Sequence, residues 1–290
     1  MWRKAALVFV ALALGIAVAV VYGNARWNSD TLALRERIEA ARTPPAPGTA
    51  IHRVEDLAGL PAPVQRYFRA VLAANQPLVA AATLEHTGTF DMGKDAAQWK
   101  PFTSTQRVVT RPPGFDWDAR IAVMPGVAVH VHDAYVAGAG LLRASVLGLV
   151  PVADLQGSGD LAQGELMRYL AEAAWYPTAL LPSQGVHWEA IDAHSARATL
   201  ADGGTWVSLV FRFGDDGLID TVRADARGRT IANTVIATPW MGRFWNYAVR
   251  DGMRIPLDGE VAWVMPEGPK PYWRGHVDQI RYEFVEHSRP

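Results

Sequence analysis

Two histidines on a predicted strand form the most metal-like group in the chain. His130 and His132 stand at positions i and i+2, and side chains at that spacing project from the same face of a strand. Two imidazoles placed in this way can chelate zinc or iron, but such sites use three or four protein ligands. No third ligand follows at a recognisable spacing, and the sequence lacks a His-Glu-x-x-His motif. We therefore expect a solvated strand face, with no bound metal and no other cofactor.

A predicted helix carries the second group with chemical potential. Glu165, Arg168 and Glu172 line one face of the segment 160–174 at spacings of three and four residues. A carboxyl group that faces a groove can act as a general acid or base, so Glu172, close to Trp175, is a candidate for hydrolysis. The same pattern is common as an ion-pair stripe on a solvated helix face, and we favour that interpretation. No catalytic residue is assigned.

Composition excludes several classes of protein. The chain has no cysteine, which rules out disulfides, thiolate metal sites and cysteine nucleophiles. It also lacks the Gly-x-Ser-x-Gly motif of serine hydrolases. The formal net charge of its 290 residues is -1, and no basic block occurs, so nucleic acid is not expected as a partner.

Tryptophan is unusually frequent, at 11 of 290 residues. Trp2 and Trp27 flank an apolar N-terminal run, where interface anchors are expected. The other nine lie in or beside predicted strands and the helix 160–174. Large amphipathic rings either fill the core of a sheet or line an apolar pocket. If there is a pocket, we expect its ligand-binding residues to be Trp175, Trp188, Trp206, Tyr247 and Trp263.

The N-terminal run predicts a membrane segment. Arg3 and Lys4 precede an uncharged stretch from Ala5 to Tyr22, close to the roughly 20 residues that cross a bilayer. Basic residues on the leading side keep that end in the cytoplasm, which predicts an inner-membrane protein with a periplasmic C-terminal domain. A removed signal peptide is the alternative, because Gly23 and Ala25 have the spacing of a cleavage site. The length of the run favours an uncleaved anchor.

The chain divides into three parts. Residues 1–26 are the anchor or signal segment, and residues 27–59 connect it to the rest. This connection is expected to begin with a short, weak helix over Trp27–Ala41 and to continue as a proline-stiffened spacer over Thr43–Ala50. Residues 60–286 form one β-rich extracytoplasmic domain.

Periodicity predicts the elements of this domain. A helix follows Pro61, and a second helix spans 160–174. Residues 138–152 fit either a strand or a loop. Other segments alternate with period two between turn signals, and the strands are expected at 83–90, 102–110, 115–124, 127–136, 186–192, 196–200, 205–213 and 218–227.

The last stretch, Ala237–Phe284, combines nine aromatic rings with Asp-Gly dipeptides, which predicts antiparallel strands joined by tight hairpins. The fold class is therefore α+β. Its main element is a large curved antiparallel sheet, a half-barrel packed on helices, after one N-terminal transmembrane helix.

Several motifs carry a resemblance to a known family: Leu60-Pro-x-Pro-Val-Gln-Arg-Tyr-Phe, Trp175-Tyr-Pro-Thr-Ala-Leu-Leu-Pro, Trp240-x-Gly-Arg-Phe-x-x-Tyr, Arg254-Ile-Pro and Glu260-x-x-Trp. Through them the segment 60–284 resembles an uncharacterised bacterial family of membrane-anchored proteins with a domain of unknown function. This resemblance implies no activity. The order of elements is also similar, more distantly, to the LolA-like lipoprotein-carrier fold, in which a half-open barrel closed by helices holds acyl chains.

Three functions follow as hypotheses. The first is a non-enzymatic, membrane-anchored binder of a hydrophobic ligand, such as a lipid or a lipoprotein acyl chain. The second is a structural or protein-interaction module of the cell envelope, with all rings in the core. The third is a hydrolase that uses Glu172 or the pair His130 and His132. A cavity in the sheet, and the chemistry of its walls, would distinguish them.

Overall fold

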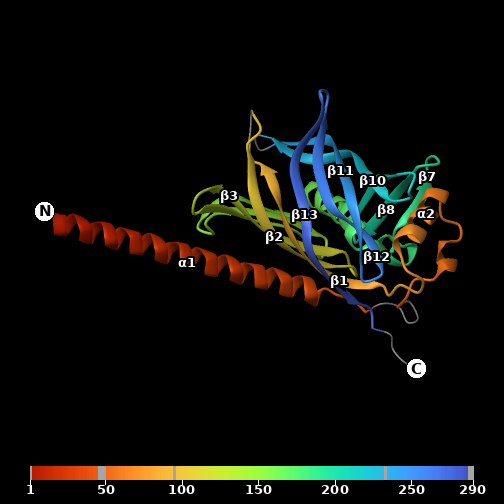
Figure 1. The fold of residues 1–290 in the computed structure, drawn as a ribbon, viewed down its shortest axis with the longest axis horizontal. Coiled ribbons are helices and arrows are strands. Elements are labelled where there is room, and N and C mark those ends of the chain that lie inside the picture. The colour runs from red at the N-terminus through yellow and green to blue at the C-terminus, as the bar shows by residue number, and fades with distance from the viewer. Residues whose placement is uncertain (1, 45–49, 94–95, 232–233, 287–290) are drawn as a thin grey trace.

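A computed structural model describes residues 2–44, 50–93, 96–231 and 234–286. One long helix, α1 (Trp2–Ala40), leads into a domain built on an antiparallel sheet (Figure 1). Two further helices are α2 (Ala62–Val71) and α3 (Asp160–Glu172). The described residues form thirteen strands: β1 (Val79–Asp91), β2 (Trp99–Val109), β3 (Gly114–Met124), β4 (Val127–Val136), β5 (Ala139–Val146), β6 (Val150–Gly157), β7 (His187–Ala190), β8 (Ser195–Asp202), β9 (Thr205–Phe213), β10 (Ile219–Ile231), β11 (Thr234–Arg250), β12 (Met253–Met265) and β13 (Gly268–Phe284).

Two meanders make up this sheet. Strands β1 to β6 follow one another on one side, and β7 to β13 do so on the other, so that the strand order is β6-β5-β4-β3-β2-β1-β13-β12-β11-β10-β9-β8-β7. The meanders join where β1 pairs with β13, for example at Leu84 opposite Ile280. The two edges of the sheet are therefore β6 and β7, and twist accumulated over so many strands curves it.

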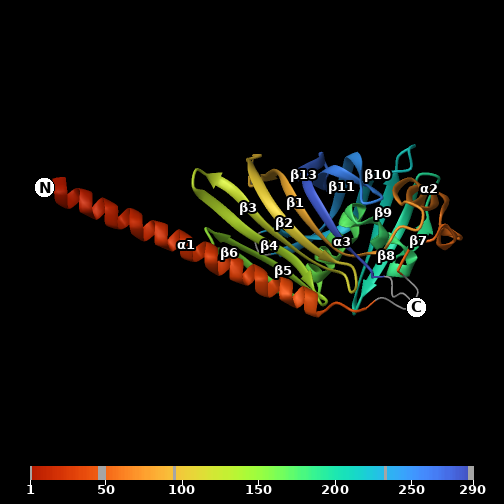
Figure 2. The ribbon, with the colours of Figure 1, turned by 60° about the horizontal axis from the view of Figure 1, so that its bottom comes forward.

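Helix α3 bridges the two halves of the curved sheet. The chain leaves the edge strand β6, forms α3 and several short 3-10 turns, and then enters the opposite edge strand β7. Helix α3 contacts β4 and β5 in one half and β9 and β10 in the other, and the sheet curves around it (Figure 2). The connection between the edges thus crosses the inner face of the sheet.

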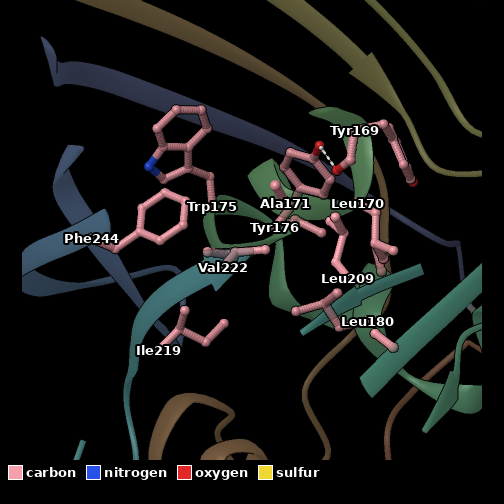
Figure 3. Close-up of a cluster of buried hydrophobic side chains, with 14 of the residues drawn as sticks. Tyr169, Leu170, Ala171, Trp175, Tyr176, Leu180, Leu209, Ile219, Val222 and Phe244 are labelled. Carbon is pink, nitrogen blue, oxygen red and sulfur yellow. Dashed lines mark hydrogen bonds between the residues drawn. The ribbon is translucent and has the colours of Figure 1, made fainter. Parts of the chain in front are cut away.

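Packing of an apolar stripe holds α3 in this position. Leu166, Tyr169 and Leu170 are buried, as the helical spacing predicts. Figure 3 shows Leu170 beside Leu209 of β9 within a cluster of buried side chains that also holds Val222 of β10. The Tyr176 hydroxyl donates a hydrogen bond of 3.0 Å to the carbonyl oxygen of Tyr169, which fixes the turn after the helix.

The end of α1 packs on the outer face of the sheet. Instead of a short, weak helix that begins at Trp27, α1 is continuous from Trp2. Its buried residues Trp27, Thr31, Leu34 and Ile38 recur every three or four positions and contact β2, β3 and β4. Leu34 and Ile38 belong to an apolar cluster completed by Ala81, Val109, Ala134, Val136 and Leu141. Residues 45–49 of the expected spacer lie outside the described residues.

This packing corrects the prediction that His130 and His132 lie on a solvated face. Both are buried beneath α1, where Trp27 meets His130 edge-on and stacks on His132. Burial lowers the pKa of each imidazole to about 4, so both are neutral near neutral pH. Within the described ranges, no group of three or more His, Cys, Asp or Glu residues is arranged so that it could hold a metal ion.

Two further features of the chain bear on the sequence analysis. Residues 138–152, expected to be either a strand or a loop, form β5 and the start of β6, with a tight turn at Leu147 and Gly148. Helix α1 is long and apolar enough to cross a membrane, a property that signal sequences share.

Truncation of Trp27 tests the docking of α1. Because Trp27 is buried and its indole nitrogen donates a 2.9 Å hydrogen bond to Asp118, Trp27→Ala is expected to lower the free energy of unfolding by about 3–5 kcal/mol. The matched substitution Leu32→Ala, on the exposed side of the same helix, should change it by less than about 0.5 kcal/mol. Denaturant unfolding of the full chain in detergent, followed by near-UV circular dichroism, measures both. Equal effects would contradict the docking.

Candidate functional site

A partly enclosed cavity of about 830 Å³ lies between α3 and the inner face of the sheet. This volume falls in the upper part of the range of roughly 300–1,000 Å³ that is usual for small-molecule sites. Lining residues come from α3 and the turn after it, from β1 and β3 to β6 on one side, and from β10 to β13 on the other. The cavity is therefore the part of the space between the two halves of the sheet that α3 does not fill.

Aromatic side chains form much of the cavity surface. Six rings, called the aromatic wall below, are Trp117, Trp175, Trp240, Phe244, Trp263 and Trp273. Trp175 contacts two of the others, with centroid distances of 6.0 Å to Phe244 and 6.3 Å to Trp273. Tyr272 stacks on Trp263 at 5.7 Å. Such a surface suits an apolar or planar ligand, since rings offer a large contact area with few rotatable bonds.

A row of glycines lets one of these rings lie flat on the sheet. Gly88, Gly275 and Gly259 are register partners on the neighbouring strands β1, β13 and β12. The Trp273 ring covers Gly275 so closely that a Cβ atom there would approach the ring to 2.2 Å. A larger residue at Gly275 would push the indole into the cavity.

Charged residues meet at the α3 side of the cavity. Arg168 lies between two acids: its Nε donates to Glu172 at 2.7 Å and its Nη1 to Asp133 at 2.5 Å. The guanidinium also lies 5.0 Å from the ring centroids of both Phe115 and Trp117. Asp133 and Glu172 are both mostly shielded from solvent. Their charge-assisted hydrogen bonds with Arg168 are therefore stronger than bonds between neutral groups.

A second arginine, Arg227 of β10, approaches the same place. Its Nη2 is 3.6 Å from Glu165 Oε1, and its Nη1 donates to the Tyr272 hydroxyl at 3.3 Å. The guanidinium lies 5.1 Å from the centroid of the Trp240 ring. Asp133, Glu165, Arg168, Glu172 and Arg227 are named the charged cluster. The cavity is thus lined by the aromatic wall and by the charged cluster, and Asp91, Arg229, Glu260 and Lys270 add charged groups elsewhere on its surface.

Glu165 is the unusual member of the charged cluster. Its side chain is only 6% exposed, and burial together with the nearby Asp133 carboxylate raises its pKa well above the ordinary value of 4.5. With Glu165 protonated, the two arginines balance Asp133 and Glu172. Asp133 Oδ1, Glu165 Oε2 and Arg227 Nε are buried with no hydrogen-bond partner among the described residues.

Burial of the charged cluster corrects the interpretation of Glu165, Arg168 and Glu172 as a solvated ion-pair stripe. The ion pair between Arg168 and Glu172 forms at i, i+4, as the spacing indicates. Its face is covered because α3 turns it toward the cavity and β4. Helical spacing alone does not reveal which face a sheet will cover.

Two of the five expected ligand-binding residues, Trp175 and Trp263, line the cavity. Trp206 is 64% exposed on β9. Trp188 is buried elsewhere, where its indole nitrogen donates to the carbonyl oxygen of Leu180 at 2.9 Å. Tyr247 lies on a separate groove beside α2. A binding role stays a prediction for all five.

Sequence reasoning missed Trp240 and Trp273 as lining residues. Each is followed two positions later on its strand by a glycine that leaves room beside the ring, Gly242 and Gly275. Residues two apart share a face of a strand. A Trp-x-Gly pair on a strand was therefore the available signal for a ring lying against the sheet.

Arg168 is expected to be essential for the folded state. Arg168→Met leaves Asp133 and Glu172 buried without their cation, so the free energy of unfolding should fall by about 3–5 kcal/mol. Arg223→Met removes an exposed arginine 3.9 Å from Asp225 and should cost less than about 1 kcal/mol. Denaturant titration of both variants measures the difference, and a small effect at Arg168 would contradict the described network.

The raised pKa of Glu165 predicts a pH dependence of stability. Unfolded chains lose this proton near pH 4.5, whereas the folded protein keeps it to higher pH. The folded state binds more protons over that interval, so the contribution of Glu165 to stability falls as pH rises from the ordinary pKa to the raised one. Glu165→Gln should remove this decline. Unfolding free energies of both proteins from about pH 4 to about pH 8 would test it, and parallel curves would contradict it.

Comparisons with known proteins identify a family and find similar solved structures. The solved structure of the LolA superfamily protein NE2245 from Nitrosomonas europaea is similar over 77% of this chain and 93% of its own, with 8% identity and a TM-score of 0.32. A likeness at that score adds nothing to the argument about function. No curated protein matches the chain. Residues 58–282 match the "Family of unknown function (DUF6920)", and the chain therefore belongs to this family.

Proposed function

We propose that this chain is a non-enzymatic binding protein for a lipid-like ligand, held at a membrane by α1. The observation that carries the proposal is the cavity of about 830 Å³, with its aromatic wall and its charged cluster. A soluble globular core closes such a space with side chains, because packing at high density is favourable. An open space lined by rings favours a ligand that fills it.

The chemistry of the walls favours an amphipathic ligand. Burial of a hydrocarbon chain against the aromatic wall would contribute about 25 cal/mol per Å² of apolar area. The charged cluster, balanced when Glu165 is protonated, would hold a polar head group. A free fatty acid, a phospholipid and a lipoprotein acyl chain all have this division into apolar and polar parts.

The proposed location of the protein is the extracytoplasmic side of the inner membrane. Arg3 and Lys4 precede the apolar run of α1, and the positive-inside rule keeps that end in the cytoplasm. Under this proposal residues 60–286 act as one periplasmic domain, and the membrane supplies the ligand.

Two alternatives remain as proposals of other classes. An envelope interaction module would need no cavity, so the open space at α3 favours the binder over it. A hydrolase is favoured by one observation, the raised pKa of Glu165 inside the cavity. His130 and His132 do not support it, since they lie beneath α1 on the other face of the sheet. Recovery of cleaved lipid ester, lost with Glu165→Gln, would favour the hydrolase.

Filling the cavity should abolish binding. Gly242 lines the cavity, and a Cβ atom there would meet its nearest neighbours at ordinary distances of 3.9–4.0 Å. Gly242→Leu is therefore expected to place a side chain in the ligand's space with little strain and to weaken binding by at least about tenfold. A polyene fatty acid that fluoresces in apolar surroundings, excited by energy transfer from cavity tryptophans, provides the measurement.

The matched control is Gly204→Leu. Gly204 lies in the turn between β8 and β9, and a Cβ atom there would have nothing within 4 Å. This variant should bind the fatty acid as the unchanged protein does. If neither protein nor variant binds it, and organic extraction of the purified chain yields no stoichiometric lipid, the proposed function fails.

A further inference from the structure

The turn between β5 and β6 lies at the point where α1 leaves the domain. Gly23 of α1 is in close contact with this turn: a Cβ atom at Gly23 would lie 2.3 Å from the carbonyl oxygen of Leu147. Arg26 donates a hydrogen bond of 3.0 Å to the carbonyl oxygen of Gly148. Before Gly23, the uncharged run of α1 extends away from the sheet (Figure 2). The turn is therefore level with the end of that run.

Contacts beyond Gly23 fix this arrangement. Trp27 and Thr31 both hydrogen-bond Asp118, and Arg35 pairs with Asp116 at 3.0 Å. Because these contacts recur over three turns of α1, the helix cannot swing relative to the sheet without breaking them. If the uncharged run spans a bilayer, the turn between β5 and β6 must lie at the bilayer surface.

The strand that starts at this turn exposes apolar side chains. Val150 is 62% and Val152 63% exposed on the edge strand β6, and Met124 is 61% exposed at the end of β3. Exposed apolar groups on an unpaired edge favour aggregation in water, and proteins usually protect such edges with charge. Pro151 and Asp154 also lie on β6, but the exposed valines stand at its start, close to the membrane segment. Their chemistry fits the acyl and head-group boundary of a bilayer.

The exposed edge is continuous with the cavity. Leu142 and Leu155 face each other across β5 and β6, and both line the cavity. Nearer the turn, Val146 pairs with Val150. A β-bulge in β6 between this pair and the pair of Leu142 and Leu155 places all four side chains on the same face of the hairpin. An apolar path thus runs along one face of this hairpin from the aromatic wall toward the turn.

We propose that the edge formed by β6 and the turn before it contacts the bilayer that holds α1, and that lipid passes along this edge into the cavity. Only the passage of lipid into the cavity rests on the proposed function. The membrane contact itself depends on the position of α1 and on the exposed valines.

Single cysteines test the membrane contact, since the chain has none of its own. The full chain carrying Val152→Cys would be labelled with a nitroxide and reconstituted into vesicles of phosphatidylethanolamine and phosphatidylglycerol. Oxygen, which concentrates in the bilayer, should relax the label several-fold more than a water-soluble nickel chelate does. Val150→Cys should behave in the same way.

Val249→Cys is the matched control. Val249 is 64% exposed at the end of β11, near the turn that contacts α2 and away from Gly23. Its label should favour the nickel chelate, as at a site in water. Similar, water-like accessibility at residues 150, 152 and 249 would overturn the membrane contact, whether or not the protein binds lipid.

Kinetics test the path. In the full chain, Val150→Asp with Val152→Asp should slow the transfer of the polyene fatty acid from vesicles at least about fivefold, while affinity for the same probe in detergent stays unchanged. Val249→Asp should alter neither quantity. Unchanged transfer in the paired variant would overturn the path. Failure of the unchanged chain to bind the probe would refute the proposed function, and the label measurements would still decide the membrane contact.

Discussion

The position of α3 is the constraint on which the domain depends. An open sheet of this size leaves two unpaired edges and an uncovered inner face. Helix α3 contacts both halves of the sheet and so limits how far it can open. Apolar contacts hold one side of the helix, while Arg168 joins its other side to Asp133 of β4 through a buried ion pair. The same helix therefore limits the opening of the sheet and forms one wall of the cavity.

The cost of this arrangement explains why charges occur in an apolar cavity. A helix packed only against apolar side chains would not be expected to carry buried ions, because ions are expensive to desolvate. Arg168 extends from α3 to Asp133 of β4 and also binds Glu172, so each of these charges has a partner. Arg168 also stacks beside Phe115 and Trp117, so its charge is satisfied within an aromatic environment.

Local patterns in the sequence predicted much of the fold. The period-two segments, the Asp-Gly hairpins and the helix 160–174 are all determined by neighbours within a few residues. Pairing of β1 with β13 joins segments about 200 residues apart in sequence, and no local pattern contains it. The same limit applies to α1, whose buried stripe of Trp27, Leu34 and Ile38 has meaning only once the outer face of the sheet exists.

Errors about the candidate site have the same origin. Period identifies the face on which a side chain lies, but the cover of that face is decided by distant segments. His130 and His132 were expected in solvent and are covered by α1, and Glu165 was expected in solvent and is covered by the sheet. Tryptophan content indicated a large aromatic surface correctly. It could not separate Trp206, which is exposed, from Trp175, which lines the cavity, because residue type alone carries no position.

Docking of α1 also determines the effective concentration of lipid at the cavity under the proposed function. The last turns of α1 are part of the domain's own packing, so this part of the helix is fixed relative to the sheet. Under the proposed function, a lipid already in the bilayer would encounter the cavity as a tethered partner does, at an effective concentration set by its density in the leaflet. Solubility of the lipid in water, which is negligible for long chains, would then place no limit on binding. The protein would serve the membrane that holds it and no other.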